Sequence, residues 1–342
     1  MTSPRPVRAI EGAGADDLSP AALVAANEPV ILRGLAADWP LVAAGRDGVA
    51  AAMAYLKRFD GGRPVVGFTG DAAIGGRFFY RDDMTGLNFA AQRVGLSDYL
   101  DRISADLDDP TAPARYVGST DLDTYLPGLR ADNDLSLPPL SPGTAPPLAS
   151  LWIGNRTVAA THYDMSNNLA VCVVGRRRFT LFPPDQVANL YPGPLEPTPG
   201  GQVVSMVDLR APDLERYPRF ADALAQAQVA ELAPGDVLFY PALWWHNVEA
   251  LAPFNVLLNY WWNDVPAFVD SPMTTLLHAM LSLRDRPAAE RAAWRAMFDH
   301  YVWDGGEDAR DHLPPAIRGD LAPLDEPAAR RLRARLLQRL NR

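Results

Sequence analysis

The chain has 342 residues, 48% of them hydrophobic, with a formal net charge of −9 at pH 7 and a single cysteine, Cys172. This is enough apolar material for one large core or two smaller ones. A lone cysteine excludes an intramolecular disulfide. The acidic balance argues against a nucleic-acid partner, because phosphate contacts need clustered Lys and Arg. Since no apolar run reaches membrane-spanning length and no signal-peptide pattern is present, we expect a cytoplasmic protein with no membrane partner.

Residues 1–111 are predicted to contain α/β elements that pack on a following barrel. Apolar residues recur at helical spacing over 20–24, 48–59 and 96–107. Runs rich in β-branched and aromatic residues predict strands at 30–33, 65–68 and 78–80.

Residues 112–265 are dominated by strand patterns separated by Pro- and Gly-rich turns. Strands are expected at 116–118, 151–154, 169–174, 179–182, 237–240 and 256–262. The composition of residues 126–148 predicts a long surface loop, and residues 186–230 form an insertion with a Pro/Gly-rich start. We therefore predict a mainly β core over 112–265.

Residues 266–342 change to a helical pattern. Helices are expected over 273–283, 288–303 and 328–340. Their apolar stripe contains Met273, Leu276, Leu277, Met280, Leu281, Trp294, Met297, Phe298 and Tyr301. A stripe of this kind is a packing surface, either on the chain's own barrel or on a second copy in a homodimer.

A candidate metal-binding motif consists of His162, Asp164 and the distant His246. Residues i and i+2 of a strand point to the same side, so His162 and Asp164 can reach one ion while Tyr163 points away. Two imidazoles and one carboxylate are the ligand set of a non-haem Fe(II) facial triad, which leaves the opposite face open for a co-substrate and O2. The His-x-Asp tripeptide alone is a weak signal, because single histidines are common in cores and on surfaces.

The surroundings of this motif make the signal specific. His-Tyr-Asp at 162–164 is followed by Gly-x-x-Arg-Phe-x-Leu-Phe-Pro-Pro-Asp at 175–185, Pro-Gly-Asp at 234–236 and Trp-Trp-His at 244–246. In this order they resemble the cupin-like Jumonji C (JmjC) family, as does the opening at 29–40. Within it, the chain looks most like the asparaginyl hydroxylase of hypoxia-inducible factor.

This resemblance implies a double-stranded β-helix, also called a cupin or jelly-roll fold. It also implies Fe(II) held by His162, Asp164 and His246, with 2-oxoglutarate as co-substrate. C-terminal helices form a dimer interface in the hydroxylase resembled here, so a homodimer through residues 266–342 is expected.

The expected co-substrate site departs from the family pattern. The cation that holds the distal carboxylate of 2-oxoglutarate is a lysine in the resembled enzyme, and Arg177 occupies the matching position here. The single lysine, Lys57, lies far from the motif. Arg177 shares one strand face with Phe179 and Leu181, which favours an inward direction. The alternative is that Arg176, Arg177 and Arg178 form a solvated turn.

Softer matches concern the remaining co-substrate contacts. Tyr116 aligns with a tyrosine at the distal carboxylate, and Asn168 and Asn259 align with asparagines near the iron-chelating end. A threonine expected three residues before His162 is Ala159 here. The residues at the distal carboxylate site therefore differ from the family pattern.

We expect a 2-oxoglutarate-dependent dioxygenase that hydroxylates a protein or peptide side chain and releases succinate and CO2. A small-molecule hydroxylase of the same mechanism is one alternative. A cupin-like sensor or binding protein that keeps the metal without turnover is another, favoured by the altered carboxylate site. No sequence feature fixes which residue or metabolite is oxidised.

Overall fold

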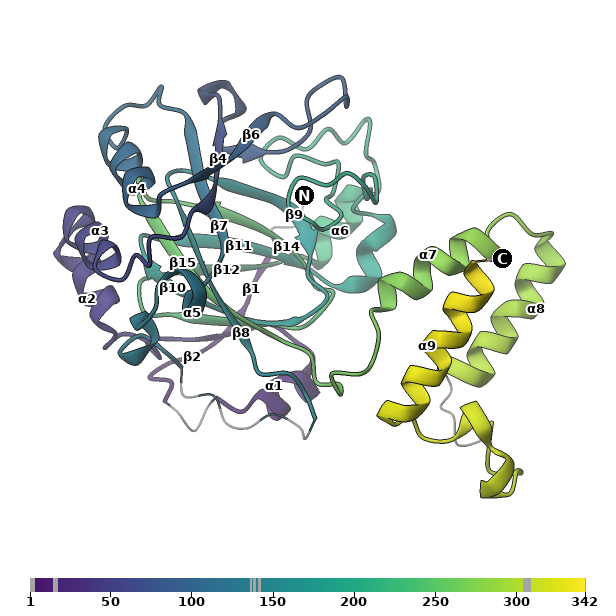
Figure 1. Cartoon of the computed structure of the whole chain (residues 1–342). Helices are drawn as coiled ribbons and strands as arrows, with labels where there is room; N and C mark the ends of the chain where they lie inside the picture. The colour runs from purple at the N-terminus through teal and green to yellow at the C-terminus, as the bar shows by residue number, and fades with distance from the viewer. Residues whose placement is uncertain are drawn as a thin grey trace. The chain divides into compact units, whose positions relative to one another are not determined.

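In this computed structural model, residues 4–14, 18–135, 137, 140, 143–303 and 309–341 are described. Contacts divide the chain into two units (Figure 1). Residues 1–140 and 146–263 form the first, and residues 141–145 and 264–342 form the second.

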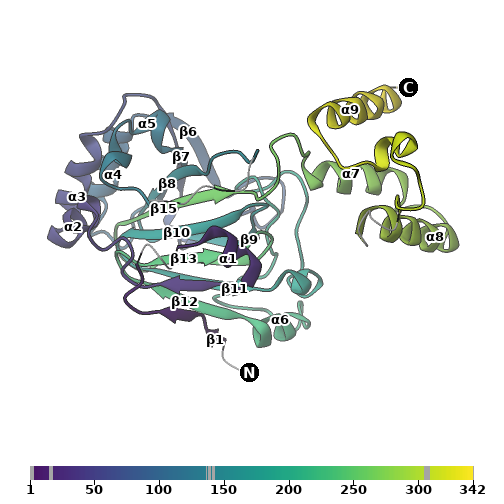
Figure 2. The ribbon, with the colours of Figure 1, turned by 90° about the horizontal axis from the view of Figure 1, so that it is seen from below.

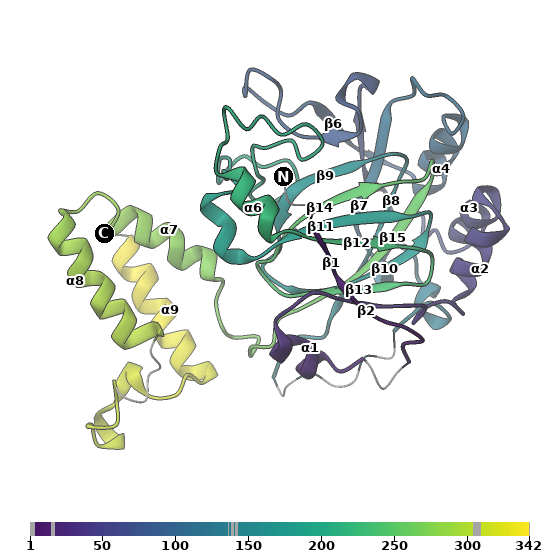
Figure 3. The same cartoon turned by 180° about the vertical axis from the view of Figure 1, so that it is seen from behind.

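The first unit is built on two mixed β-sheets. The six-stranded sheet has the order β1 (Arg5–Pro6), β12 (Gln228–Leu232), β11 (Arg177–Phe182), β14 (Trp245–Ala250), β9 (Val158–Tyr163) and β5 (Arg77–Phe78). The nine-stranded sheet has the order β2 (Arg8–Ile10), β3 (Val30–Leu32), β13 (Val237–Tyr240), β10 (Asn167–Val174), β15 (Asn255–Trp262), β8 (Leu148–Gly154), β7 (Ala114–Asp121), β4 (Val65–Gly70) and β6 (Phe89–Val94). Figures 2 and 3 show both sheets from other sides.

Apolar side chains from both sheets meet in one buried cluster between them. Phe179, Leu181 and Val248 come from the six-stranded sheet, and Ala170 and Leu238 come from the nine-stranded sheet. Two sheets that bury their inner faces against each other are the arrangement of a jelly roll. The predicted mainly β, cupin-like fold is therefore confirmed.

Helices cover the outer face of the nine-stranded sheet. These are α2 (Pro40–Asp47), α3 (Val49–Lys57) and α4 (Leu96–Ala105), which lie side by side in Figures 1 and 3. Leu41, Leu56 and Leu100 pack in one cluster with the outward residues Leu169 and Val171 of β10. Both faces of β10 are consequently buried, which explains its unbroken apolar sequence.

The segment between β11 and β12 covers the outer face of the six-stranded sheet. It contains a 3-10 turn (Pro184–Ala188) and helix α6 (Phe220–Gln226). Phe220 packs with Phe182 and Trp245, and the Trp245 and Tyr163 rings lie 4.8 Å apart. Trp245 therefore packs on this insertion.

Several features of the first unit differ from the sequence-based expectation. Helix α2, strand β6 and helix α6 were not predicted. Strands β1, β2 and β3 extend the two sheets and do not form a separate layer. The expected surface loop 126–148 is wrong in its first part, because Leu126, Leu129 and Leu135 are buried. Residues 136, 138, 139, 141 and 142 of that loop lie outside the described residues.

Short helices complete this unit: α1 (Pro20–Ala26), α5 (Leu122–Tyr125) and 3-10 turns at Ala72–Ile74 and Leu129–Ala131. Ser19 begins α1 as its N-cap, since its side chain accepts from the backbone N–H of Ala22.

The second unit is helical. It contains α7 (Pro272–Ser282), α8 (Ala288–Phe298) with a π-helical turn (Asp299–Trp303), 3-10 turns at Pro315–Ile317 and Gly319–Leu321, and α9 (Glu326–Leu340). Between residues 264 and 341, only Ala309 and Ala329 are buried among the residues described. No helix in the described part of the chain is long and apolar enough to cross a membrane.

Candidate metal centre

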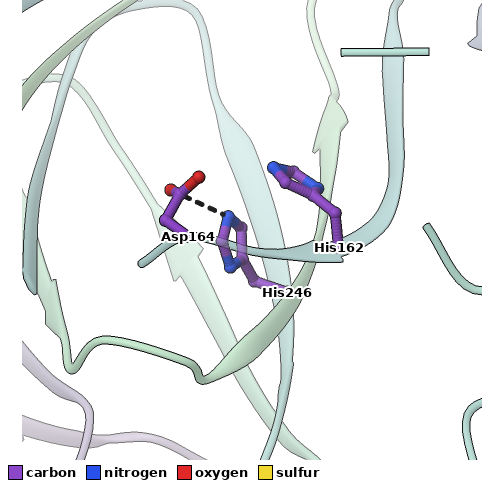
Figure 4. Close-up of side chains that lie close together, drawn as sticks. All are labelled: His162, Asp164 and His246. Carbon is purple, nitrogen blue, oxygen red and sulfur yellow. Dashed lines mark ion pairs between the residues drawn. The ribbon is translucent and has the colours of Figure 1, made fainter. Parts of the chain in front are cut away.

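Three side chains converge at one end of the sheets. The ligand atoms of His162, Asp164 and His246 all lie within 4.8 Å of one another. His162 on β9 and His246 on β14 are paired in register, and their ring centroids are 4.3 Å apart. Asp164 directly follows β9, and its Oδ2 lies 3.6 Å from Nε2 of His246 (Figure 4). The structure thus brings together all three residues of the motif.

Hydrogen bonds fix which nitrogen of each histidine faces the others. Nδ1 of His162 lies 2.8 Å from the carbonyl oxygen of Ala160, and Nδ1 of His246 lies 3.0 Å from that of Trp244. A carbonyl oxygen can only accept, so each Nδ1 carries the hydrogen and donates it. Nε2 of both rings then keeps its lone pair for a metal ion, the usual arrangement for a histidine ligand.

Burial keeps His246 neutral. The residue is 2% exposed. Desolvation and the neighbouring His162 lower the pKa of His246 to about 4, although the Asp164 carboxylate acts in the opposite direction. A histidine must be unprotonated to bind a metal, so this ligand is available throughout the neutral range.

The low pKa of His246 predicts a pH-dependent stability of the metal-free protein. The folded-state pKa of about 4 lies below the ordinary 6.5, so between these values the unfolded chain binds more protons. Stability conferred by the neutral form is therefore lost as the pH falls from 6.5 toward 4. We expect the free energy of unfolding to fall by about 2 kcal/mol more in the wild type than in His246→Gln between pH 7.5 and pH 5.

Urea unfolding of both proteins at the two pH values measures this difference. Equal losses in the wild type and in His246→Gln would contradict it, because other titrating groups act on both proteins alike.

A strained turn fixes the backbone beside these ligands. Leu243 has a φ of 66°, in the left-handed region that residues with a Cβ rarely adopt. Its N–H donates to the carbonyl oxygen of Asp164 over 2.8 Å. The N–H of Ala242 donates to Oδ1 of Asn167 over 3.1 Å. These two bonds connect the turn before His246 to the segment that carries Asp164.

Arg177 is buried between the sheets, only 2% exposed. Its neighbours point outward, since Arg176 and Arg178 form ion pairs with Glu231, and Arg178 also with Glu249. Among the described residues, Nε and Nη2 of Arg177 have no hydrogen-bond partner and no carboxylate pairs with it. A buried cation of this kind is costly unless an anion joins it.

Tyr116 lies next to this guanidinium. Burial raises the pKa of the Tyr116 phenol, while Arg177 acts in the opposite direction as a nearby cation and hydrogen-bond partner. The Tyr116 ring stacks between Phe78 and Trp152, at centroid distances of 5.8 and 5.7 Å. The two residues expected at the distal carboxylate are thus in contact. Lys57 is elsewhere, paired with Asp101 on the outer helices.

Asn168 and Asn259 lie on adjacent strands and bond to each other. Nδ2 of Asn259 donates to Oδ1 of Asn168 over 3.2 Å, and both side chains are buried. Nδ2 of Asn259 also lies 3.4 Å from the hydroxyl of Tyr240. Sequence reasoning missed Tyr240, whose only signal was its place two residues after Leu238 on the inward face of β13.

The donor set fits a divalent transition-metal ion. Two neutral imidazoles and one carboxylate approach from one side, as in the facial triad of non-haem Fe(II) oxygenases. The buried nitrogens Nε and Nη2 of Arg177, which lack partners among the described residues, fit an anionic molecule bound in the same interior.

Comparisons with known proteins agree with this geometry. Residues 16–268 match the family described as "Cupin-like domain". The chain is 36% identical to human HSPB1-associated protein 1 over 156 residues, 44% of this chain and 31% of that protein. It is 40% identical to chicken tRNA wybutosine-synthesizing protein 5 over 107 residues, 31% of this chain and 30% of that protein. It is 34% identical to Lysine-specific demethylase JMJ31 of Arabidopsis thaliana over 128 residues, 36% of this chain and 23% of that protein.

These matches span about a third or less of the curated relatives. They support the Jumonji C type of cupin as a whole and do not single out the asparaginyl hydroxylase of hypoxia-inducible factor. The family match covers most of the first unit, including every residue of the metal motif. The chain therefore belongs to the cupin-like domain family.

Proposed function

We propose that this protein is an Fe(II)- and 2-oxoglutarate-dependent oxygenase. The observation that carries the proposal is the buried guanidinium of Arg177, which has no carboxylate partner among the described residues. It faces the interior that also contains the metal motif, because Leu181 lies on the same strand face as Arg177 and is paired in register with His246. A dicarboxylate with one end on the metal would supply the missing anion.

The roles of the residues follow from their chemistry. His162, Asp164 and His246 would hold Fe(II), and the Arg177 fork would hold the distal carboxylate by two charge-assisted hydrogen bonds. Tyr116 would support Arg177, and Asn168 and Asn259 would orient the chelating end. Iron with 2-oxoglutarate supplies the activation of O2, with succinate and CO2 as products. The apolar side chains between the sheets would keep water out.

Succinate production tests this proposal. Purified protein given Fe(II), 2-oxoglutarate and O2 without a substrate is expected to release succinate slowly, whereas His246→Ala should release none. If the metal-loaded wild type neither binds 2-oxoglutarate nor forms succinate, the proposal fails. If it binds 2-oxoglutarate and never turns it over with any substrate, the sensor or binding-protein alternative is favoured.

For the substrate, we propose the side chain of a protein or peptide. The names of the relatives point to different substrates, because one is a lysine-specific demethylase and another is a tRNA wybutosine-synthesizing protein. A net charge of −9 makes tRNA the poorer substrate for this chain. A small-molecule hydroxylase of the same mechanism is the alternative. Mass spectrometry of peptide and metabolite libraries, with and without Fe(II), distinguishes these substrates.

We also propose that the second unit forms a homodimer. Its helices bury almost no side chains of their own, and Leu276, Leu277, Leu281, Trp294, Met297 and Tyr301 are exposed, Leu281 by 78%. Apolar surface of this extent is normally covered by a partner, and a symmetric dimer would use the same residues from both copies.

Light scattering at micromolar concentration is expected to give twice the chain mass for the wild type. Leu277→Glu combined with Leu281→Glu should give the mass of one chain, because a charge cannot be buried in an apolar interface at low cost. Val187→Glu, at an exposed apolar residue of the first unit, is the control and should remain dimeric. A wild type with the mass of one chain would contradict the dimer and leave the stripe as cover for the chain itself.

A further inference from the structure

Tyr240 lies beside the metal ligand His246 and close to Tyr116, the hydrogen-bond partner of Arg177. Its side chain is 2% exposed, at the end of β13, and it belongs to the apolar cluster between the sheets. Its ring centroid is 4.6 Å from that of His246 and 5.9 Å from that of Phe179. Asp164 and Tyr116 both act electrostatically on its phenol. Tyr240 is therefore close to two metal ligands and to Tyr116, the partner of Arg177.

The hydrogen bonds around Asn259 leave Tyr240 as the available donor. Nδ2 of Asn259 has two hydrogens, and its two acceptors are Oδ1 of Asn168 and the hydroxyl of Tyr240. The Asn259 amide can then present only its Oδ1 to a ligand, and Oδ1 is an acceptor that disfavours a carboxylate. The Tyr240 hydroxyl accepts from Asn259, so its own hydrogen remains to be donated.

The phenol keeps this hydrogen. An ordinary phenol titrates only at about pH 10, so the Tyr240 hydroxyl is protonated at neutral pH and can donate. A neutral buried hydroxyl has to find an acceptor, and no acceptor for its hydrogen is present among the hydrogen bonds of the described residues.

We propose that the Tyr240 hydroxyl donates a hydrogen bond to the metal-proximal carboxylate of the bound keto acid, and that Asn259 positions this hydroxyl. The inference rests on the proposed function and deepens it. Arg177 and Tyr116 would recognise the distal carboxylate, while Tyr240 would recognise the end that chelates the metal. Asn259 then acts through Tyr240 and need not touch the ligand.

Two ligands distinguish recognition of the metal-chelating end from recognition of the distal carboxylate. 2-Oxoglutarate carries both ends, whereas oxalate can chelate the metal and has no distal carboxylate. Binding of each to Mn(II)-loaded protein without O2 is measured by calorimetry, which does not depend on turnover. Tyr240→Phe removes only the hydroxyl and is expected to weaken both ligands by about 10- to 100-fold, the effect of one hydrogen bond to a charged group. Arg177→Met should weaken 2-oxoglutarate and leave oxalate unchanged.

Tyr163→Phe is the matched control. Tyr163 lies between two metal ligands in the sequence, but its ring packs on Trp245 and the insertion. This variant should bind Mn(II), oxalate and 2-oxoglutarate as the wild type does. Mn(II) affinity should also be unchanged in Tyr240→Phe. This result would show that the metal site of the variant is folded. In a double-mutant cycle, Asn259→Ala and Tyr240→Phe should be strongly non-additive if one residue acts through the other.

The role of Tyr240 would be overturned if Tyr240→Phe bound oxalate and 2-oxoglutarate with wild-type affinity. The proposed function would stay intact in that case, provided that Arg177→Met bound 2-oxoglutarate more weakly than the wild type. Strict additivity in the cycle would overturn the positioning role of Asn259. A wild type that binds Mn(II) but neither acid would overturn the proposed function itself.

Discussion

Asp164→Ala is expected to abolish binding of a divalent metal ion and, with it, all oxygenase activity. Asp164 is the only carboxylate in the motif formed by His162, Asp164 and His246, so the variant removes one of three ligands and the only negative charge among them. Replacing residues that merely support a ligand lowers metal affinity by about 10- to 100-fold. Loss of a ligand should exceed that range.

Calorimetric titration with Mn(II) measures the affinity directly. Asp185→Ala is a suitable control, because Asp185 is an exposed carboxylate shortly after β11 and its loss should leave affinity unchanged. Asp164→Glu should retain weak binding, since it keeps the charge and moves the oxygen. A wild-type affinity in Asp164→Ala would remove Asp164 from the ligand set and leave the motif without its charge.

Local periodicity was sufficient to predict two of the three residues of the metal motif. His162 and Asp164 are two residues apart at the end of a strand, and this spacing alone brings them to one side. The same alternation predicted that Arg177 would point inward and that Arg176 and Arg178 would point outward. In the structure Arg177 is buried, Arg176 is exposed and Arg178 is half-buried on the outer face. The pairing of His162 with His246 is a contact between distant strands. Only the order of motifs along the chain indicated it.

Tyr240 shows why other interior residues could not be found in this way. Strand β13 is buried on both faces, with Phe239 in the cluster under the helices and Tyr240 in the cluster between the sheets. When both faces are apolar, alternation no longer separates inside from outside. The hydroxyl of Tyr240 becomes informative only beside His246 and Asn259, which reach it from other strands.

Composition gave a wrong prediction where a polar segment contains buried residues. Residues 126–135 contain Pro, Gly and Asp, which predict a surface loop. Leu129 is buried there, and the buried Asn133 accepts from the N–H of Leu41. Strand β1 has two residues, one of them a proline, and is defined by its parallel partner β12. Such elements depend on contacts with distant chain segments, so no local sequence pattern predicts them.

Arg177→Ala is expected to weaken 2-oxoglutarate binding to the Mn(II)-loaded protein by about 100-fold or more, while Mn(II) affinity stays unchanged. Truncating one partner of a buried charge pair costs about 3–5 kcal/mol, because the remaining charge is left unpaired in a medium that solvates it poorly. Arg177 is buried and Nε and Nη2 lack partners among the described residues, so no neighbouring group there would compensate for its loss.

Arg177→Lys tests whether charge or fork geometry matters at this position. A lysine keeps the cation as a single point charge and gives up the planar pair of donors. We expect it to recover part of the lost affinity, with the remaining deficit reflecting the pocket's adaptation to the longer side chain and the contact with Tyr116.

Arg178→Ala is the matched control, because Arg178 lies on the same strand and pairs with Glu231 on the outer face. Equal affinities of the wild type and Arg177→Ala would move the carboxylate site to another residue or remove 2-oxoglutarate from the reaction. Loss of affinity in Arg178→Ala as well would instead point to a general disturbance of β11.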